Sequence, residues 1–222
     1  MKVAVITAIF GGYDELKPIK TRARAICVTD ADMEPVAGWQ IVKWNGPTNS
    51  PEMNSRFPKC LPMKFIHEAD YSIWCDGSIQ WHCDPVSVLF SLETRHVACF
   101  QHRRHRMTAQ EVDAVLDGNR ACADSVMAQT EEYKRDGFLR SGGFDEAEFF
   151  DLAVIVREHS TQAESFGEKW WAENTRWNSW DQLSFNYTLW KTGLGCSTIP
   201  GRLQHGYFCH KTKHKKGRPE CA

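Results

Sequence analysis

The sequence predicts an α/β fold in a single domain, with a mostly parallel central sheet flanked by helices. Short buried runs rich in Val and Ile alternate along the chain with longer segments of helical character. This alternation is typical of sheets built from strand–helix–strand units. The 222 residues, of which 42% are hydrophobic and 25% charged, are enough for one large domain with a real core.

Each element is justified by its local pattern. Strands are expected at 2–9, 24–29, 39–44, 71–75, 96–100 and 152–156. The proline-punctuated stretch 45–62 is expected to be a long loop with at most a turn or two of helix. Helices are expected from Pro85, from a capping box of Thr108 and Glu111 to about residue 135 with a break near Gly118, at 162–173 and at 180–191. We expect a domain at 1–201 and a basic tail at 202–222.

The charge and cysteine content narrow the class of protein. A formal net charge of −1 gives no general argument for binding nucleic acid or an anionic membrane surface. The nine cysteines are an odd number without a CxxC pair, the first residues run straight into a strand, and no apolar stretch approaches membrane-spanning length. These features predict reduced thiols in a cytoplasmic protein.

Polar side chains follow three of the expected strands at the point where each ends. They are Tyr13 and Asp14 after the first strand, Asp30 and Asp32 after the second, and Asp76 and Ser78 after the strand at 71–75. In open α/β sheets, ligands bind at the carboxyl ends of the strands. We therefore expect a binding site where these three loops meet.

Asp76 is open to two interpretations. A carboxylate at the end of a buried strand, followed by the small residues Gly77 and Ser78, can hold a hard divalent cation such as Mg²⁺ or Mn²⁺. Alternatively, Asp-Gly simply begins a turn between strands at 71–75 and 79–81.

Asp181 also has two interpretations. Ser179 and Gln182 fit a capping box, which places Asp181 in the first helical turn beside the positive end of the helix dipole. The functional alternative makes Asp181 a base or a substrate clamp that projects from the helix start into a cleft.

Basic side chains offer candidates for a diphosphate clamp. Arg103, Arg104 and Arg106 directly follow the strand at 96–100, and arginine matches the geometry of phosphate oxygens. A solvated surface loop is an equal alternative. Arg56 and Lys59, in the long proline-containing stretch, are weaker candidates for the same role.

The late histidines give a weaker metal signal. Cys209, His210 and His214 have zinc-like spacing, but the second pair of ligands that a structural zinc site requires is missing. Surface histidines in a basic segment are the favoured interpretation.

Six motifs, taken together and in order, resemble a known family. The chain is similar to the glycosyltransferase-like domain shared by plant mucilage- and pectin-related Golgi proteins and by bacterial capsule or polysaccharide proteins. The motifs are TAIFGGYDEL (7–16), CVTD (27–30), YSIWCDGSI (71–79), QHRRHR (101–106), GGFDEAEFFDLAVIVREH (142–159) and WDQLSF (180–185).

This resemblance implies a GT-A fold with a Rossmann-like nucleotide-sugar half, and Mn²⁺ or Mg²⁺ as cofactor. The family's Asp-x-Asp motif corresponds to Asp76-Gly77-Ser78, so serine replaces the second acidic ligand. His205 is the expected additional metal ligand. Asp181 and Gln182 resemble the Asp-Gln-x-x-x-Asn pattern of glycogenin-like retaining transferases, where these residues line the donor sugar and acceptor side.

The expected activity is transfer of a sugar from a nucleoside-diphosphate donor to a saccharide acceptor. Tyr13, Thr7, Ala8 and Asp30 are expected around the nucleoside, and Asp76 is expected to bridge ribose and metal. The alternative is a non-catalytic module of the same fold that binds nucleotide sugars or saccharides. A small zinc and nucleic-acid protein is the remaining alternative, and the near-neutral charge disfavours it.

Overall fold

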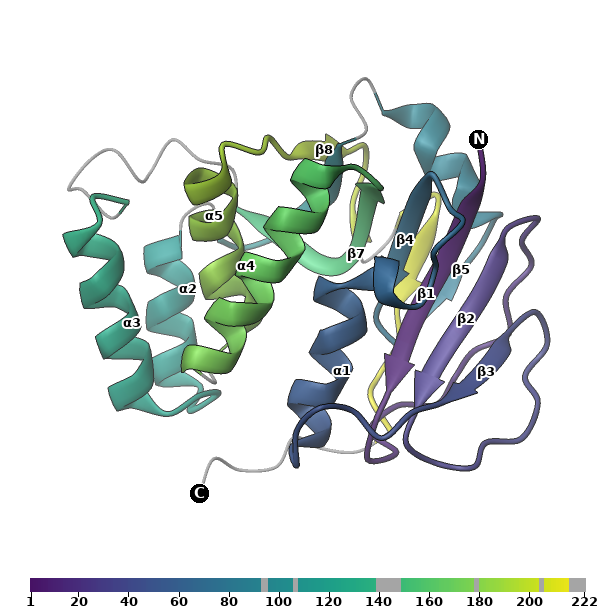
Figure 1. Ribbon diagram of the computed structural model, residues 1–222, viewed down its shortest axis with the longest axis horizontal. Helices are drawn as coiled ribbons and strands as arrows, with labels where there is room; N and C mark the ends of the chain where they lie inside the picture. Colours follow the sequence, from purple (N-terminus) through teal and green to yellow (C-terminus); the bar gives the residue numbers. More distant parts are fainter. Residues whose placement is uncertain (93–95, 106–107, 139–148, 178–179, 204–205, 216–222) are drawn as a thin grey trace.

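The structure, a computed structural model, describes residues 1–92, 96–105, 108–138, 149–177, 180–203 and 206–215 (Figure 1). Its centre is a seven-stranded sheet in the order β3-β2-β1-β4-β7-β6-β8. The strands are β1 (Val3–Ile9), β2 (Arg24–Thr29), β3 (Gln40–Lys43), β4 (Tyr71–Cys75), β6 (Val97–Gln101), β7 (Phe150–Glu158) and β8 (Ser197–Ile199).

The sheet is mostly parallel. Neighbouring strands from β3 to β4 pair in parallel, β7 runs antiparallel to both β4 and β6, and β6 pairs in parallel with β8. The predicted α/β class with a mostly parallel sheet is therefore confirmed. Because only β7 is reversed, the carboxyl ends of β1, β2, β4 and β6 all lie at one edge of the sheet.

Each face of the sheet has its own core. On one face, side chains of β1 and β7 pack against the helices α1 (Pro51–Cys60), α4 (Thr161–Trp177) and α5 (Asp181–Thr192). On the other face they pack against the 3₁₀ helix η2 (Pro85–Ser91) and a second sheet of β5 (Ile79–Trp81) and β9 (Cys209–Lys211). Alternate residues of β1 supply the two cores, as the two-residue period of a strand requires.

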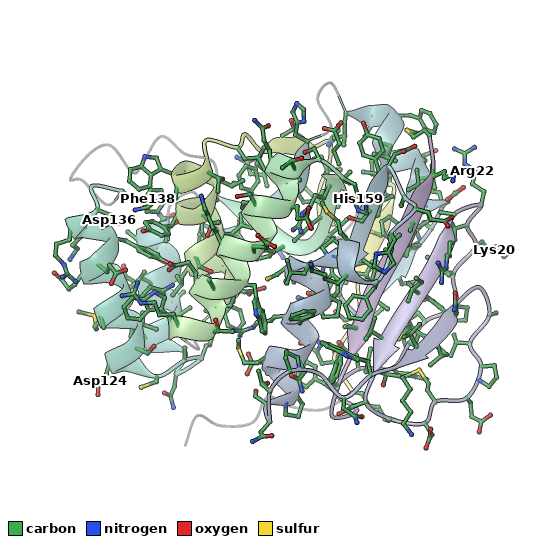
Figure 2. The ribbon with its side chains drawn as sticks, viewed as in Figure 1. Lys20, Arg22, Asp124, Asp136, Phe138 and His159 are labelled. Atoms are coloured by element: carbon green, nitrogen blue, oxygen red, sulfur yellow. The ribbon has the colours of Figure 1, made fainter. Side chains whose placement is uncertain are left out.

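Two further helices lie outside α5 in Figure 1: α2 (Thr108–Asp117) and α3 (Ala123–Arg135). Tyr133, Phe138 and Tyr187 form a buried aromatic cluster that fixes the end of α3 against α5. The Tyr187 hydroxyl donates to Asp136 Oδ2 over 2.5 Å, and Figure 2 labels Asp136 and Phe138 at this junction. Among the described helices, none combines the length and the apolar character that crossing a bilayer demands.

The expectation of a loop at 45–62 is wrong, because α1 occupies ten of these residues and the 3₁₀ helix η1 (Pro62–Lys64) follows it. Ser50 caps α1 by accepting a hydrogen bond from the Met53 N–H, and Pro51 stands in the first turn, where a missing N–H costs nothing. Pro58 lies inside the helix. Packing of α1 against β1 and α4 outweighs the hydrogen bond that Pro58 cannot make.

Of two smaller local predictions, the capping box of Thr108 and Glu111 is wrong and the turn between the strands at 71–75 and 79–81 is confirmed. Glu111 hydrogen-bonds His105 instead of closing a capping box, and in the described part of the chain the Thr108 hydroxyl has no partner. The Asp76 carbonyl accepts from the Ile79 N–H, so a turn does follow β4. That turn is no hairpin, because β5 pairs with β9 and not with β4. It carries the chain from one sheet to the other.

Candidate functional site

The candidate site begins at Asp76, the residue that follows β4. Its N–H donates to the Ala153 carbonyl of β7 over 2.8 Å, which fixes the backbone. Its carboxylate Oδ1 accepts a hydrogen bond of 2.9 Å from the indole Nε1 of Trp74. With 26% of its side chain exposed, Asp76 is held in one orientation at the carboxyl edge and still reaches the surface.

Lys59, from the last turn of α1, joins Asp76 to Asp181 at the start of α5. Its Nζ lies 2.6 Å from Asp181 Oδ2 and 3.7 Å from Asp76 Oδ1. We call this group the Asp76–Lys59–Asp181 cluster. Residues 59, 76 and 181 come from three separate segments, so the contact of these charges is a product of the fold.

The cluster keeps Lys59 positively charged. Burial alone lowers the pKa of this ammonium group, but attraction to Asp181 and Asp76, with the hydrogen bond to Asp181, outweighs burial and raises the pKa above its ordinary value. Burial raises the pKa of the neighbouring Cys60 thiol to about 12, so that thiol stays protonated. The site therefore offers a fixed cation between two carboxylates and no thiolate nucleophile at Cys60.

The start of α5 is held from the core side. Trp170, fully buried in α4, donates from Nε1 to the Asp181 carbonyl over 3.2 Å, and the Ser184 hydroxyl donates to the same oxygen over 3.1 Å. Trp170 is thus a core residue that positions Asp181. Gln182 donates to the Phe150 carbonyl of β7 and accepts from the Trp180 indole.

The capping box expected at this helix start depends on Ser179 and stays a prediction. Trp180 is the N-cap residue of α5 and makes no capping hydrogen bond with its side chain. Ser179, the expected cap, lies outside the described residues. Gln182 instead ties the helix start to the sheet, which leaves Asp181 to face Lys59.

The loop after β1 lies beside the same strand end. A side chain at Gly77 would place its Cβ 2.9 Å from the Asp14 Cβ, so glycine permits the close approach of the two loops. Asp14 Oδ1 lies 2.8 Å from His214 Nδ1, and the ring centroids of Tyr13 and His214 are 4.8 Å apart. Asp30 accepts hydrogen bonds from the Gly11 N–H with both carboxylate oxygens.

The segment after β9 covers this region, which the sequence did not indicate. The Thr212 N–H and hydroxyl both donate to the Ser78 carbonyl, over 2.7 and 2.8 Å. The Ser78 hydroxyl is buried and has no hydrogen-bond partner among the described residues. Part of the stretch predicted as a tail is therefore packed against the domain. The predicted domain boundary at residue 201 stays a prediction.

Four of the remaining predicted site residues lie in β1, in α1 and after β6, and the fifth is not described. Thr7 and Ala8 are buried within β1, at 0% and 8% exposure. Arg56 is buried on α1 and pairs with Glu52 over 2.6 Å. Arg104 is exposed beyond the end of β6, and His205 lies outside the described residues.

The predicted divalent cation fits the described residues poorly at Asp76. Asp76 supplies one carboxylate, its Oδ1 already faces the Trp74 indole and the Lys59 ammonium, and the Ser78 hydroxyl is buried. Among the described residues, no group of three ligating side chains includes Asp76. His205, the expected additional ligand, is outside the described residues, so its part in a metal site stays a prediction.

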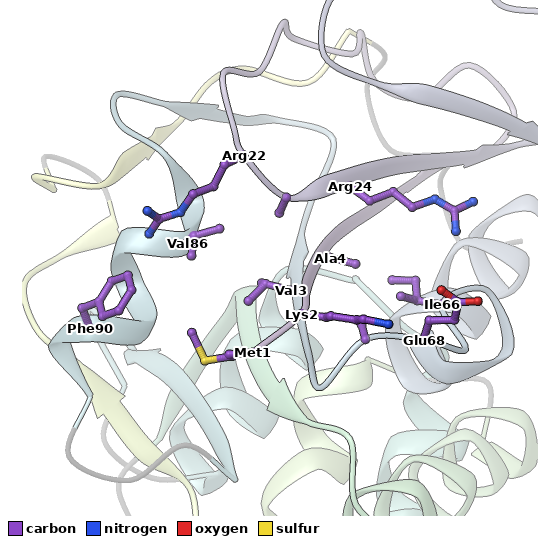
Figure 3. Close-up of a pocket in the computed structure, with 12 residues that line it drawn as sticks. Met1, Lys2, Val3, Ala4, Arg22, Arg24, Ile66, Glu68, Val86 and Phe90 are labelled. Carbon is purple, nitrogen blue, oxygen red and sulfur yellow. The ribbon is translucent and has the colours of Figure 1, made fainter.

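A cavity of about 520 Å³ lies at the opposite edge of the sheet (Figure 3). It is lined by the starts of β1 and β2, by Ile66 and Glu68 before β4, and by Val86 and Phe90 of η2. The cavity and the Asp76–Lys59–Asp181 cluster thus lie at opposite edges of the sheet. The charged side chains of the cluster make the carboxyl edge the better candidate for the functional site.

The sheet topology gives an α/β domain with a polar carboxyl edge, and the family profile gives its class: a glycosyltransferase-like domain. The chain belongs to the family described as TOD1/MUCI70, glycosyltransferase-like domain, whose profile matches residues 20–198. The resemblance seen in the sequence is thereby confirmed.

Two relatives from Arabidopsis thaliana show the same relationship. The chain is 26% identical over 212 residues to "Probable hexosyltransferase MUCI70", covering 83% of this chain and 36% of the relative. It is 26% identical over 163 residues to "Alkaline ceramidase TOD1", covering 68% of this chain and 35% of the relative. The chain therefore spans about a third of the length of these relatives.

Solved structures of similar shape include two glycosyltransferases. Mouse xyloside xylosyltransferase 1 aligns with a TM-score of 0.46 at 9% identity, covering 89% of this chain and 84% of that one. The bifunctional glycosyltransferase WbbM aligns with a TM-score of 0.48 at 12% identity, covering 90% of this chain and 39% of that one.

Proposed function

We propose that this domain transfers a sugar from a nucleoside-diphosphate donor to a saccharide acceptor, in polysaccharide or glycan synthesis. The observation that carries the proposal is the Asp76–Lys59–Asp181 cluster. It places a buried ammonium group between two carboxylates at the edge of the sheet where ligands bind in this type of fold. Membership of a glycosyltransferase-like family supports the same reaction class.

In this proposal each group has a distinct task. The bond between the anomeric carbon and the diphosphate oxygen breaks, and the leaving diphosphate gains negative charge. Lys59 stabilises that charge, since it is already cationic and fixed in place. The Asp76 carboxylate, oriented by Trp74, takes the ribose of the donor.

Asp181 contacts the acceptor in this proposal. A new bond forms from the acceptor hydroxyl oxygen to the anomeric carbon, and Asp181 accepts the hydroxyl proton if the reaction inverts configuration. Tyr13 and Asp30 flank the nucleoside end, where Asp30 acts by holding the Gly11 backbone of the first loop. Gln182 orients the helix start that carries Asp181.

A bound Mn²⁺ or Mg²⁺ would add Lewis-acid stabilisation of the leaving group. Because the described residues around Asp76 do not by themselves fit such an ion, no step here depends on one. Cytoplasmic location is part of the proposal, and it is supported by the described cysteines, all of which are free thiols.

A second candidate is a module that binds nucleotide sugars or saccharides without turnover. The Asp-Gly-Ser sequence favours it, since the second acidic ligand of the family motif is absent and Lys59 partly neutralises the first. The two candidates differ in a single measurable property, which is release of nucleoside diphosphate.

The test is a panel of nucleoside-diphosphate sugars, assayed for binding by calorimetry and for release of nucleoside diphosphate, with and without Mn²⁺. We expect binding and slow donor hydrolysis by wild type, and loss of both in Asp76→Ala. The matched control is Asp70→Ala, which removes an exposed carboxylate just before the other end of β4. Binding without turnover would favour the module, and no binding to any donor would reject the proposal.

One relative is named as a ceramidase, so hydrolysis of a ceramide amide is assayed in parallel. Ceramide cleavage that survives Asp76→Ala, without any sugar transfer, would contradict the proposed function directly.

A further inference from the structure

A group of three metal-ligating side chains lies outside the Asp76–Lys59–Asp181 cluster. His102 and His105 follow the carboxyl end of β6, and Glu111 stands in the first turn of α2. One ligand atom from each of the three lies within 4.8 Å of the other two. We call this group the His102–His105–Glu111 cluster.

The cluster is organised by its own hydrogen bonds. His105 Nδ1 lies 2.5 Å from Glu111 Oε2, and the backbone N–H of His105 donates to His102 Nδ1 over 2.9 Å. The two imidazole centroids are 4.7 Å apart. Phe149 packs edge-on against His102 with ring centroids 5.4 Å apart, so one wall of the cluster is aromatic.

The burial of Glu111 favours a cation close to its carboxylate. Glu111 is 1% exposed, and Arg120 approaches its Oε1 only to 3.9 Å from a side chain that is 39% exposed. A buried carboxylate is costly unless a cation compensates it, and a bound ion would do so more fully.

Two imidazoles and one carboxylate are a ligand set that suits zinc and similar divalent ions and leaves a fourth position open. Ligand atoms around tetrahedral zinc are about 3.4 Å apart, given bonds of about 2.1 Å. Side-chain rotations that move the ligand atoms by roughly an ångström would therefore bring all three within bonding distance of one ion.

We propose that His102, His105 and Glu111 bind one divalent transition-metal ion of the zinc class, with the fourth position taken by water or a substrate oxygen. The site is separate from Asp76, because β7 lies between β4 and β6 in the sheet. It does not depend on the proposed sugar transfer. The competing explanation is that the three side chains only stabilise the start of α2 by hydrogen bonds.

The experiment titrates the metal-free protein with Zn²⁺ in a chelator competition and with Co²⁺ by visible absorption, which reports tetrahedral nitrogen and oxygen ligands. We expect one equivalent of tight binding. We expect the affinity to fall by roughly 100-fold or more in His105→Ala and Glu111→Gln, since even indirect partners of a metal cost up to that amount when lost. His102→Gln, at a half-buried position, gives a third test that disturbs the fold less.

The matched control is His82→Ala. His82 Nε2 lies 2.9 Å from His210 Nδ1 in an exposed, stacked pair, the other place where two described histidines approach closely enough to chelate an ion. Binding unchanged in His82→Ala but lost in the three cluster variants supports the proposal. Absence of stoichiometric binding in wild type, or binding lost only in His82→Ala, overturns it. Asp76→Ala keeps the metal, which separates this outcome from failure of the proposed transfer.

Discussion

Lys59 and Arg157 are two buried cations beside the end of α1, and the fold treats them in opposite ways. Lys59 has Asp181 and Asp76 as partners, and its pKa is raised above the ordinary value. Arg157 on β7 donates to the Cys60 carbonyl over 2.6 Å and lies against the rings of Phe166 and Trp170. Burial without a carboxylate lowers the Arg157 pKa to about 10.

The difference between the partners of Lys59 and Arg157 distinguishes a buried cation of a functional site from one that only packs in the core. Arg157 is 2% exposed and contacts one carbonyl and two aromatic faces, while its Nε has no hydrogen-bond partner among the described residues. These contacts make it a packing element of the core between β7 and α4. Lys59 is held by carboxylates that reach the carboxyl edge, so a ligand can exchange partners with it. Both residues are buried, so burial does not distinguish their roles, whereas their partners do.

The largest expected effect comes from removing each cation in turn. Lys59→Met should lower kcat/KM for transfer about 1,000-fold, because it removes a fixed charge from the leaving diphosphate. Arg157→Met should leave the rate within about threefold, since Arg157 contacts the Cys60 carbonyl and the rings of Phe166 and Trp170 and not the charged groups of the cluster. Steady-state kinetics, with circular dichroism to confirm folding, makes the comparison. Equal losses in the two variants would make Lys59 a structural residue like Arg157.

The next effect compares two glycines that lie near these cations. A Cβ at Gly167 would lie 2.3 Å from the Cys60 carbonyl oxygen, whereas a Cβ at Gly77 would lie 2.9 Å from the Asp14 Cβ. Gly167→Ala should therefore cost about 3 kcal/mol in the free energy of unfolding, and Gly77→Ala about 1 kcal/mol.

Urea unfolding measures both values, and donor binding should weaken more in Gly77→Ala than in Gly167→Ala. The reverse order of binding would show that the contact between the first loop and the end of β4 has no role in the site.

A smaller effect is expected from Trp74→Phe. It removes the indole donor to Asp76 Oδ1, a hydrogen bond to a charged group worth about 1.5 kcal/mol. That energy corresponds to roughly tenfold in rate if the bond serves to orient the carboxylate. Trp39→Phe is the control, because it also loses an indole hydrogen bond, there to the Lys17 carbonyl. A rate change shared by both variants would point to general loosening of the structure.

The smallest expected effect is a shift in the pKa of His159, labelled in Figure 2. Burial lowers this pKa first, and the charge of Arg157 lowers it further. Arg157→Met should raise it toward the ordinary value, as followed by proton NMR titration.

The folded-state pKa of His159 lies below the unfolded value, so the unfolded chain binds more protons between the two. Stability therefore falls as pH drops through that window, and the fall should be smaller in Arg157→Met. An unchanged His159 pKa would mean that Arg157 does not influence its surroundings as a charge.

The strands could be predicted because their evidence is local. Runs such as 3–9 and 71–75 are mostly apolar and are followed by small or polar residues, so both the sheet and its polar carboxyl edge could be predicted from the sequence. Asp76 and Asp181 were singled out for the same reason. Their shared partner was not.

Lys59 ranked low because its helix was not foreseen. Pro58 stands inside α1, and only tertiary packing explains why the helix continues through it. The contact of Lys59 with Asp181 spans 122 residues, and local spacing contains no information on such a contact. β9 was not predicted either, because its three residues are too few to show a periodic pattern. His102 and His105 were seen only as part of a basic run, since their relation to Glu111 depends on how α2 begins.

The Thr212–Ser78 and His214–Asp14 contacts join positions 134 and 200 residues apart. Closing such long loops is entropically costly, and the cost is repaid only after the intervening sheet has formed. During synthesis on the ribosome, the first loop and the turn after β4 must therefore wait for residues 212–214 before their cover arrives. Competence to hold a ligand should then appear as the final event of folding, later than the burial of either core.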